Sequence, residues 1–289
     1  MVSIFQALFV TLLWSSSWVL IKFGLADIPP LTFAGLRYML AFLLLVPVAW
    51  RRGVGRELRG ITRKQWGQLI VLGSVFYAIA QGAQFVGLAL LPAITVNLLL
   101  NFTTVMVALF GIGWLGENLR PLQWAGIALA MTGTVTYFMP VNIPMEERFG
   151  LIIVVIGMLT NAFSTVLGRE VNRDMRLSPL GVTVVSMGVG ATLLLGSGIA
   201  VQGLPLIPPS GWATIVWLAV VNTAFAFTLW NHTQRTLQAV ESSMIAGTML
   251  IQIPLLAWLF LGEQPTGQQL GGMVLAGLGT FLVQIKRLR

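Results

Sequence analysis

Ten long apolar stretches run through this chain, and they constrain its fold more than any other feature. Each has about 18 to 23 residues, enough for a helix rising about 1.5 Å per residue to cross a hydrocarbon core of about 30 Å. The stretches are approximately 5–24, 31–50, 66–88, 94–115, 122–139, 149–168, 179–200, 211–231, 242–262 and 268–285. Only short connections separate them, so the sequence predicts an all-α polytopic membrane protein with ten transmembrane helices and no soluble domain.

The composition agrees with this class. Hydrophobic residues make up 56% of the chain and charged residues 9%, whereas soluble domains average roughly 25% charged residues. The first apolar stretch has no basic residue before it and is longer than a signal-peptide core, so we expect it to be a retained helix.

Several kinds of chemistry are disfavoured by the residues that the chain lacks. It has no cysteine and a single histidine, His232, so we expect no disulfide framework, no metal site and no cofactor. It has no Gly-x-x-x-x-Gly-Lys-Ser/Thr segment for binding nucleotide phosphates. Neither paired carboxylates nor a Ser/His/Asp set points to an intramembrane enzyme.

The tripeptide Leu-Gly-Glu occurs at 115–117 and again at 261–263, 146 residues later. A gapless register pairs 91–134 with 237–280. It matches Leu91/Leu237, Ala93/Ala239, Leu109/Leu255, Gln123/Gln269, Gly126/Gly272, Leu129/Leu275, Ala130/Ala276, Gly133/Gly279 and Thr134/Thr280. The sequence therefore predicts two repeats, 1–140 and 148–289, joined by an outer loop at 141–147.

The basic residues predict how the chain is oriented. With the amino terminus inside, 14 of the 17 basic residues face the cytoplasm, and Lys22, Arg37 and Arg148 remain on the outer side. Both termini are then cytoplasmic, in the inner (plasma) membrane. We attribute the net charge of +8 to topology and lipid headgroups, not to nucleic acid. Five helices per repeat is an odd number, so the second repeat is inverted relative to the first, as in many secondary transporters.

Short motifs give the chain a family resemblance. They are Trp14-Ser15-Ser16, then Pro30, Phe33 and Arg37, then Gly-Leu-Ala-Leu at 87–90, and Gly-Glu at the ends of the fourth and ninth stretches. In these the chain resembles the EamA-type ten-helix exporters of the drug/metabolite transporter superfamily. The resemblance implies two inverted five-helix repeats around a central cavity and export of small polar or amphipathic metabolites, with amino-acid exporters of the YddG type as prominent members. The chain departs from the symmetry of the two repeats at Pro254, whose counterpart in the first repeat is Ala108. We therefore do not expect the two halves to bend alike.

Two polar stripes are candidates for the walls of a cavity. The stripes are Tyr77, Gln81 and Gln84 on the third helix and Asn97, Asn101 and Thr104 on the fourth. Members of each stripe share one helix face. Polar side chains in mid-membrane are costly and face a protein interior or water, where amides can bind ammonium or carboxylate groups. The alternative role is hydrogen bonding between helices.

Further candidates are aromatic or lie beside a proline. Trp14 and Trp18 are one turn apart among serines, too deep for an interfacial belt, and either line the cavity or pack in the core. Asn161, Phe163 and Ser164 hold the related position in the second half. The predicted substrate-binding residues are Trp14, Trp18, Tyr77, Gln81, Gln84, Asn97, Asn101, Asn161, Phe163 and Gln252.

Charged helix ends predict gates. A glutamate at a helix carboxyl end faces the negative end of the helix dipole and needs compensation. We expect Lys22 and Glu263 to latch the outer mouth, and Glu117 and Arg169 the inner one. The alternatives are static pairs, headgroup contacts and, for Glu117, local pairing with Arg120. Pro254 is expected to act as a hinge, because it cannot donate a hydrogen bond within its helix.

Together these features predict a secondary transporter that exports small metabolites, foremost amino acids including aromatic and amphipathic ones, by alternating access. A broad drug or quaternary-ammonium exporter is the alternative, weakened by the lack of a mid-membrane carboxylate. A channel or a structural subunit also stays open. The expected partners are a small-molecule substrate and the lipid bilayer, without nucleic acid, and the expected state is a monomer. Facilitated efflux and proton antiport through Glu263, Arg37 or His232 are both compatible with the sequence.

Overall fold

A computed structural model describes residues 2–115, 120–139, 144–174, 177–233 and 245–284, and this part of the chain is helical without strands. The elements of the first half are α1 (Val2–Gly24), α2 (Pro30–Arg51), α3 (Val54–Leu58), α4 (Arg63–Gly73), η1 (Ser74–Ala80), α5 (Gln81–Leu90), α6 (Ala93–Asn101), α7 (Thr103–Leu115) and α8 (Pro121–Phe138). Those of the second half are α9 (Met145–Asp174), α10 (Pro179–Gln202), α11 (Pro209–Trp217), η2 (Leu218–Phe225), α12 (Ala226–Thr233), α14 (Met249–Leu261) and α15 (Gly267–Gln284).

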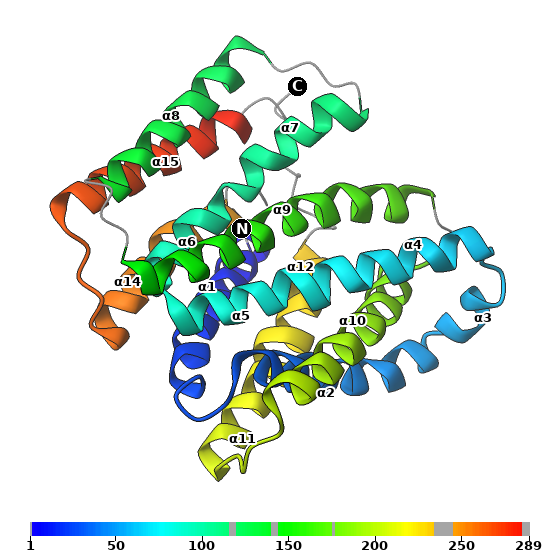
Figure 1. The fold of residues 1–289 in the computed structure, drawn as a ribbon. Coiled ribbons are helices and arrows are strands. Elements are labelled where there is room, and N and C mark those ends of the chain that lie inside the picture. Colours follow the sequence, from blue (N-terminus) through cyan, green and yellow to red (C-terminus); the bar gives the residue numbers. More distant parts are fainter. Residues whose placement is uncertain (1, 116–119, 140–143, 175–176, 234–244, 285–289) are drawn as a thin grey trace.

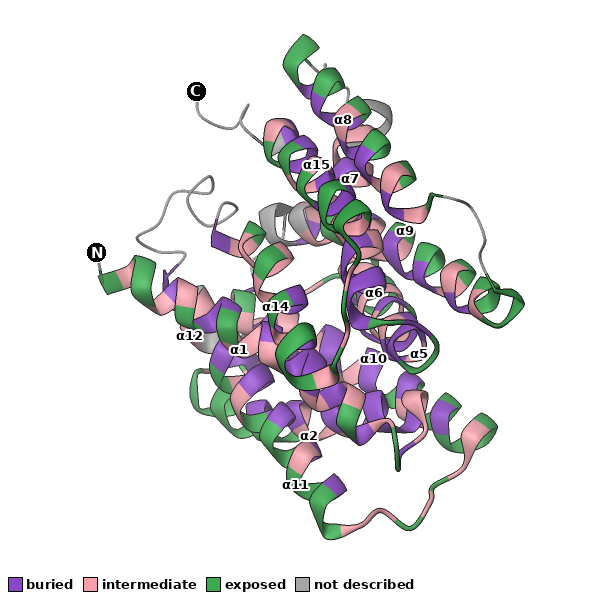
Figure 2. Cartoon of the chain, turned by 90° about the vertical axis from the view of Figure 1, so that its left-hand side faces the viewer, coloured by how far each residue is buried: buried purple, intermediate pink, exposed green. Residues whose placement is uncertain are grey.

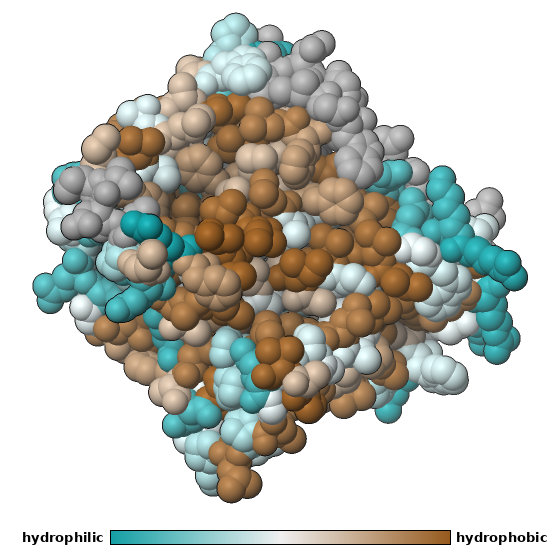
Figure 3. Space-filling model, viewed as in Figure 1, coloured by the Kyte–Doolittle hydropathy of each residue, from teal (hydrophilic) through white to brown (hydrophobic). Residues whose placement is uncertain are grey.

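Six helical segments in the described residues are long and apolar enough to cross a membrane. They are Val2–Gly24, Pro30–Arg51, Arg63–Leu90, Ala93–Phe110, Met145–Gly168 and Pro179–Gln202, and Ile245–Leu261 and Gly267–Val283 are shorter apolar helices. Figure 3 shows a broad apolar surface between a hydrophilic margin beside α3 and α4 and another at the opposite side. Buried residues gather where helices meet, and exposed ones cover the outer faces (Figure 2). The chain is thus a polytopic helical membrane protein.

Prolines mark the beginnings of several helices. Pro30, Pro121, Pro179 and Pro209 each occupy the first helical position, where a missing N–H costs no hydrogen bond and the fixed φ suits a helix. The predicted boundaries shift at two places. Helix α9 begins at Met145, inside the expected 141–147 loop, and the fourth stretch is divided into α6 and α7 at Phe102.

The described residues of each half contain one π-helical segment. In the third stretch η1 lies between α4 and α5, and in the eighth η2 lies between α11 and α12. Thr223 shows the wider turn, since its hydroxyl donates to the carbonyl of Leu218, five residues earlier, at 2.8 Å. Such segments are rare and are found mostly at functional sites. They turn the polar side chains of η1 and η2 away from the directions that a regular helix predicts.

Glycines hold the two halves together at α8 and α15, which lie side by side in Figure 1. A Cβ atom on Gly126 would lie 2.7 Å from the carbonyl oxygen of Gly279, and one on Gly272 would lie 2.6 Å from that of Gly133. Backbones therefore touch at both places. Gly126 faces Gly279 while Gly133 faces Gly272, so the two helices run antiparallel.

A second antiparallel pair, α2 and α10, packs in the same manner. A Cβ on Gly35 would lie 2.5 Å from Leu195 Cα, and one on Gly198 would lie 2.7 Å from Thr32 N. Small residues allow this approach, which supplies dispersion energy where lipid is as apolar as the side chains. Two glycine-lined seams thus join the halves.

Adjacent glycines on α15 provide a matched test of this packing. We expect Gly272→Ala to lower the melting temperature of the purified protein, with a cost of about 1–3 kcal/mol from overpacking. Gly271→Ala is the control, because nothing lies within 4 Å of a Cβ added there. Equal melting temperatures for the two variants would contradict the α8–α15 contact.

Candidate functional site

A charged cluster surrounds the turn between α5 and α6. Glu263 accepts hydrogen bonds from the backbone N–H groups of Ala93 (2.6 Å) and Ile94 (2.9 Å), the first residues of α6. Lys22 Nζ donates to the carbonyl oxygen of Leu91 at 2.7 Å. The two predicted partners therefore meet at one turn without bonding to each other. The carboxylate is stabilised by the positive end of α6, an arrangement that the sequence interpretation did not contain.

The Leu-Gly-Glu motif explains how Glu263 reaches α6. Gly262 ends α14 with φ +69°, ψ 15°, the left-handed conformation that glycine adopts without strain. The chain reverses there, and Glu263 leaves the helix toward the neighbouring α6. Gly116 and Glu117 of the first copy lie outside the described residues, as does the side chain of Arg169. The predicted inner latch thus stays a prediction.

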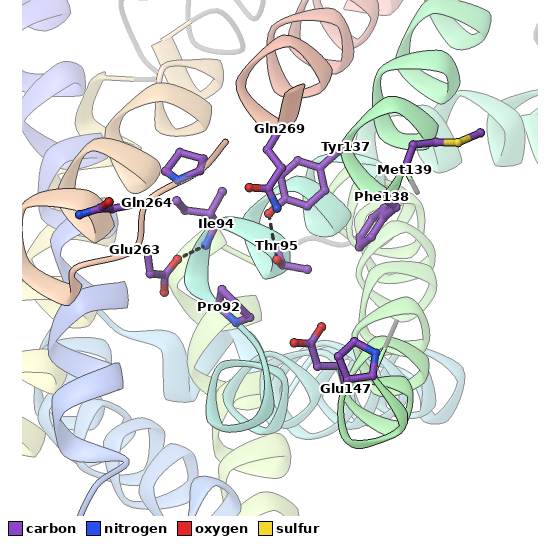
Figure 4. A pocket seen from close by; sticks show the side chains of 12 residues that line it. Pro92, Ile94, Thr95, Tyr137, Phe138, Met139, Glu147, Glu263, Gln264 and Gln269 are labelled. Atoms are coloured by element: carbon purple, nitrogen blue, oxygen red, sulfur yellow. Dashed lines mark hydrogen bonds between the residues drawn. The ribbon is translucent and has the colours of Figure 1, made fainter. Parts of the chain in front are cut away.

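A polar cavity of about 380 Å³ opens beside this turn. Figure 4 shows Glu263 on one side of it and Glu147 of α9 on the other, with Gln269 and Tyr137 between them. The hydroxyls of Tyr137 and Thr95 are 3.0 Å apart. Within the described residues, no group of three or more His, Cys, Asp or Glu side chains is arranged to hold a metal ion.

Three predicted substrate-binding amides are engaged between helices. Gln252 of α14 accepts a hydrogen bond from Ser15 at 2.9 Å and donates to Thr11 at 3.2 Å, which fastens α14 to α1. Gln81 accepts from the Tyr38 hydroxyl at 2.6 Å. Asn101 donates to Thr280 at 3.1 Å. These contacts are the interhelical hydrogen bonds that the sequence allowed as an alternative.

Two other predicted residues carry buried donors without a partner. Trp14 packs its ring against Phe227 and Trp230, with centroids 5.3 and 5.1 Å away, yet its Nε1 has no hydrogen bond. Asn97 on α6 is 6% exposed, and its Nδ2 is likewise unpaired. Buried polar atoms are nearly always hydrogen-bonded in proteins. Donors left free inside a membrane protein are available to a ligand.

The remaining predicted residues are placed as follows. Trp18 lies in the main core with Tyr77, whose ring is 5.6 Å from that of Tyr38. Phe163 packs against a second buried cluster, and Gln84 and Asn161 are half-buried. Pro254 lies inside α14, which continues through it, and lines a groove of about 980 Å³ between α14 and α15.

The sequence interpretation missed the polar residues of η2 as site candidates. Asn222 Nδ2 donates to the Leu13 carbonyl of α1, while its Oδ1 has no partner. Arg37 Nε donates to Thr223 Oγ1 at 3.1 Å. Asn222 and Thr223 are polar groups within an apolar stretch, which was the available signal. Arg37 was predicted as a motif residue and a candidate for proton antiport, not as a substrate-binding residue.

Comparisons place the chain among known transporters. A family model described as "EamA-like transporter family" matches residues 1–139 and 148–285. An Escherichia coli K12 protein named "Uncharacterized inner membrane transporter YedA" is 26% identical over 98% of this chain and 89% of its own length. A Salmonella typhimurium protein named "Probable amino-acid metabolite efflux pump" is 28% identical over 96% of this chain and 93% of its own. A crystal structure of a protein that is 20% identical in sequence aligns with a TM-score of 0.69. The alignment covers 99% of this chain and 98% of the chain in that structure.

The shared turn at α6 can be tested by a double-mutant cycle on Lys22→Ala and Glu263→Ala. Both residues bind the 91–94 turn, so we expect their effects on the free energy of unfolding to be non-additive by about 0.5–3 kcal/mol. Glu147→Ala paired with Lys22→Ala is the control, since Glu147 lines the same cavity but makes no described side-chain hydrogen bond. Purely additive losses for Lys22 and Glu263 would contradict the coupling.

Proposed function

Because this chain belongs to the EamA-like transporter family, we propose that it exports small metabolites, foremost amino acids, as a secondary transporter working by alternating access. The family makes it a membrane transporter of the drug/metabolite type, and the names of its relatives indicate transport and not catalysis. The names of relatives that are 28% identical, such as the probable amino-acid metabolite efflux pump of Salmonella typhimurium, support the finer assignment of substrate.

The proposed architecture has ten helices in two inverted five-helix repeats, 1–140 and 148–289, around a central cavity. The contacts of α8 with α15 support it, because Gly126 and Gly133 face Gly279 and Gly272, and the repeat register pairs the same four residues. Antiparallel contact between register-matched helices is what a two-fold axis in the membrane plane produces. The π-helical segments η1 and η2, one in each half, also correspond.

We place both termini in the cytoplasm of the inner membrane. The support is the basic segment around α3, which holds Arg51, Arg52, Arg56, Arg59, Arg63 and Lys64, and which the positive-inside rule assigns to the cytoplasm. Glu263 and Lys22 then lie at the outer mouth. Each outward opening that separates α14 from α6 must break the hydrogen bonds of Glu263, so this cluster is the proposed outer gate and Glu117 with Arg169 the inner one.

The observation that carries the proposed function is the pair of unpartnered donors, Trp14 Nε1 and Asn97 Nδ2. They come from α1 and α6, neighbouring helices that both contact the second half through α14. An indole and an amide are uncharged and are suited to an uncharged or zwitterionic solute, while multiply charged phosphates would need several cations. A substrate carbonyl or carboxylate oxygen would accept hydrogen bonds from both donors.

The test is counterflow in proteoliposomes, with radiolabelled amino acids and cationic drugs as the panel. We expect saturable exchange of amino acids, and a reduction of about 2- to 10-fold in Trp14→Phe and Asn97→Ala, from one lost substrate hydrogen bond of about 0.5–1.5 kcal/mol. No exchange of any amino acid would overturn the substrate assignment.

Stability separates a binding role from a structural one in these variants. Removing the Asn97 donor, which has no protein partner, should leave the melting temperature unchanged or raise it, since an unsatisfied buried group costs about 1–3 kcal/mol. Gln252→Leu is the contrasting variant, because Gln252 is hydrogen-bonded to Ser15 and Thr11 of α1 and to Thr248, and its loss should lower the melting temperature. A destabilised Asn97→Ala with normal exchange would show that this donor is structural. Trp14→Phe is judged by exchange alone, because the smaller ring also loses packing against Phe227 and Trp230.

A further inference from the structure

Arg37 is a buried cation whose charge nothing in the described structure neutralises. It lies on α2, seven residues after the helix begins, and is 5% exposed. Its Nε donates to Thr223 Oγ1 at 3.1 Å, and no carboxylate pairs with the guanidinium among the described residues. Burying an isolated charge is costly unless it is paired and hydrogen-bonded. The guanidinium therefore requires an anion that the described part of the chain does not supply.

The surroundings hold Arg37 in place without occupying its two terminal nitrogens. Thr223 Oγ1 donates to Leu218 O, so its lone pairs face the Nε of Arg37. The guanidinium carbon lies 5.3 Å from the ring centroid of Tyr38 and 5.9 Å from that of Phe85. These rings stabilise the cation through their faces and accept no hydrogen bond in the guanidinium plane. Four of its five N–H groups, those on the two Nη atoms, are left for a ligand.

A second unpartnered atom lies one residue away on η2. Asn222 Oδ1 is a buried acceptor without a donor, while the Nδ2 of the same amide is bonded to Leu13 O. That bond fixes the amide orientation and leaves the oxygen buried without a donor. A cationic donor pair and an orphan acceptor on neighbouring elements complement the two ends of a zwitterion, carboxylate and ammonium.

We propose that Arg37 is the carboxylate-binding residue of the transport site, with Asn222 Oδ1 as an acceptor for the substrate ammonium group. This inference rests on the proposed function and narrows its substrates to solutes that carry a carboxylate. A guanidinium binds a carboxylate through two parallel hydrogen bonds, which gives orientation as well as affinity. The π-helical turn of η2 places Thr223 against Arg37 and Asn222 against α1, so the site lies between α1, α2 and η2.

This site makes the protein a carboxylate-selective carrier. A quaternary ammonium compound without a carboxylate leaves the guanidinium unpaired, and the like charge of the ligand opposes its entry. An amino acid whose carboxylate is converted to an amide loses the charge-assisted pair. We therefore expect selectivity against such analogues. Leaving the buried guanidinium unpaired costs more free energy than a hydrogen bond to a neutral amide contributes.

The experiment compares L-phenylalanine with L-phenylalaninamide, which keeps the ring and ammonium group but lacks the carboxylate. In counterflow into proteoliposomes, wild-type protein should exchange phenylalanine and not the amide. Arg37→Gln should reduce phenylalanine exchange about 10- to 100-fold, as expected for loss of a hydrogen bond to a charged group. Arg37→Lys should fall between, because an ammonium keeps the charge without the planar fork.

Two controls separate binding from folding. Arg52→Gln removes the same charge from an exposed residue directly after α2 and should exchange phenylalanine at the wild-type rate. Thr223→Val keeps the charge of Arg37 but frees its Nε, and should give an intermediate rate with the preference for phenylalanine retained. An Arg37→Gln protein that is monodisperse and still prefers phenylalanine over the amide as strongly as the wild type would overturn the proposal.

The remaining outcomes distinguish this inference from the proposed function. Equal exchange of phenylalanine and its amide by the wild type would refute the carboxylate site while leaving amino-acid export standing. Exchange of no amino acid would refute the export proposal. In that case Arg37 is tested directly by comparing the melting temperature of the protein with benzoate and with benzamide. Stabilisation by benzoate alone that disappears in Arg37→Gln would support the site, and no stabilisation by benzoate would overturn it.

Discussion

Close backbone contact between glycine-bearing helices is the interaction on which the rest of this molecule depends. In lipid, hydrophobic burial does not drive one helix against another, so association relies on dispersion and on hydrogen bonds between helices. The α8–α15 and α2–α10 seams bring backbones together at Gly126, Gly272, Gly35 and Gly198. Because these seams join the two halves at separate places, the helices between them can carry unpaired polar groups without losing their arrangement.

Polar side chains divide into two groups once the partners are known. Gln252, Gln81 and Asn101 fasten one helix to another, and their roles are complete within the protein. Trp14, Asn97 and Asn222 instead retain unpaired atoms. The first group fixes the distances between helices, and the second group needs something beyond the chain. Both groups contain asparagine (Asn101 in the first, Asn97 and Asn222 in the second), so the type of residue does not separate them and the geometry of the neighbours does.

The sequence predicts much of the fold because hydrocarbon leaves few choices. Apolar length marks the helices, and proline fixes where α2, α8, α10 and α11 begin. The π-helical segments η1 and η2 were not predictable, since their wider turns leave no mark in an apolar pattern. For the site, Trp14 and Asn97 could be proposed from polarity at depth. The binding of Glu263 to the beginning of α6 could not be predicted. The two lie about 170 residues apart in sequence, and only the folded chain brings them together.

The contact glycines of α15 also restrict how this chain can vary in length. Gly272 and Gly279 are separated by seven residues, almost two turns at 3.6 residues per turn, so both face α8. An inserted or deleted residue between them would rotate one by about 100° relative to the other and turn it away from the seam. Exposed positions such as Val274 and Leu278 can exchange one apolar side chain for another. Over evolutionary time this helix is therefore free to change its lipid-facing composition while the spacing within it stays constant.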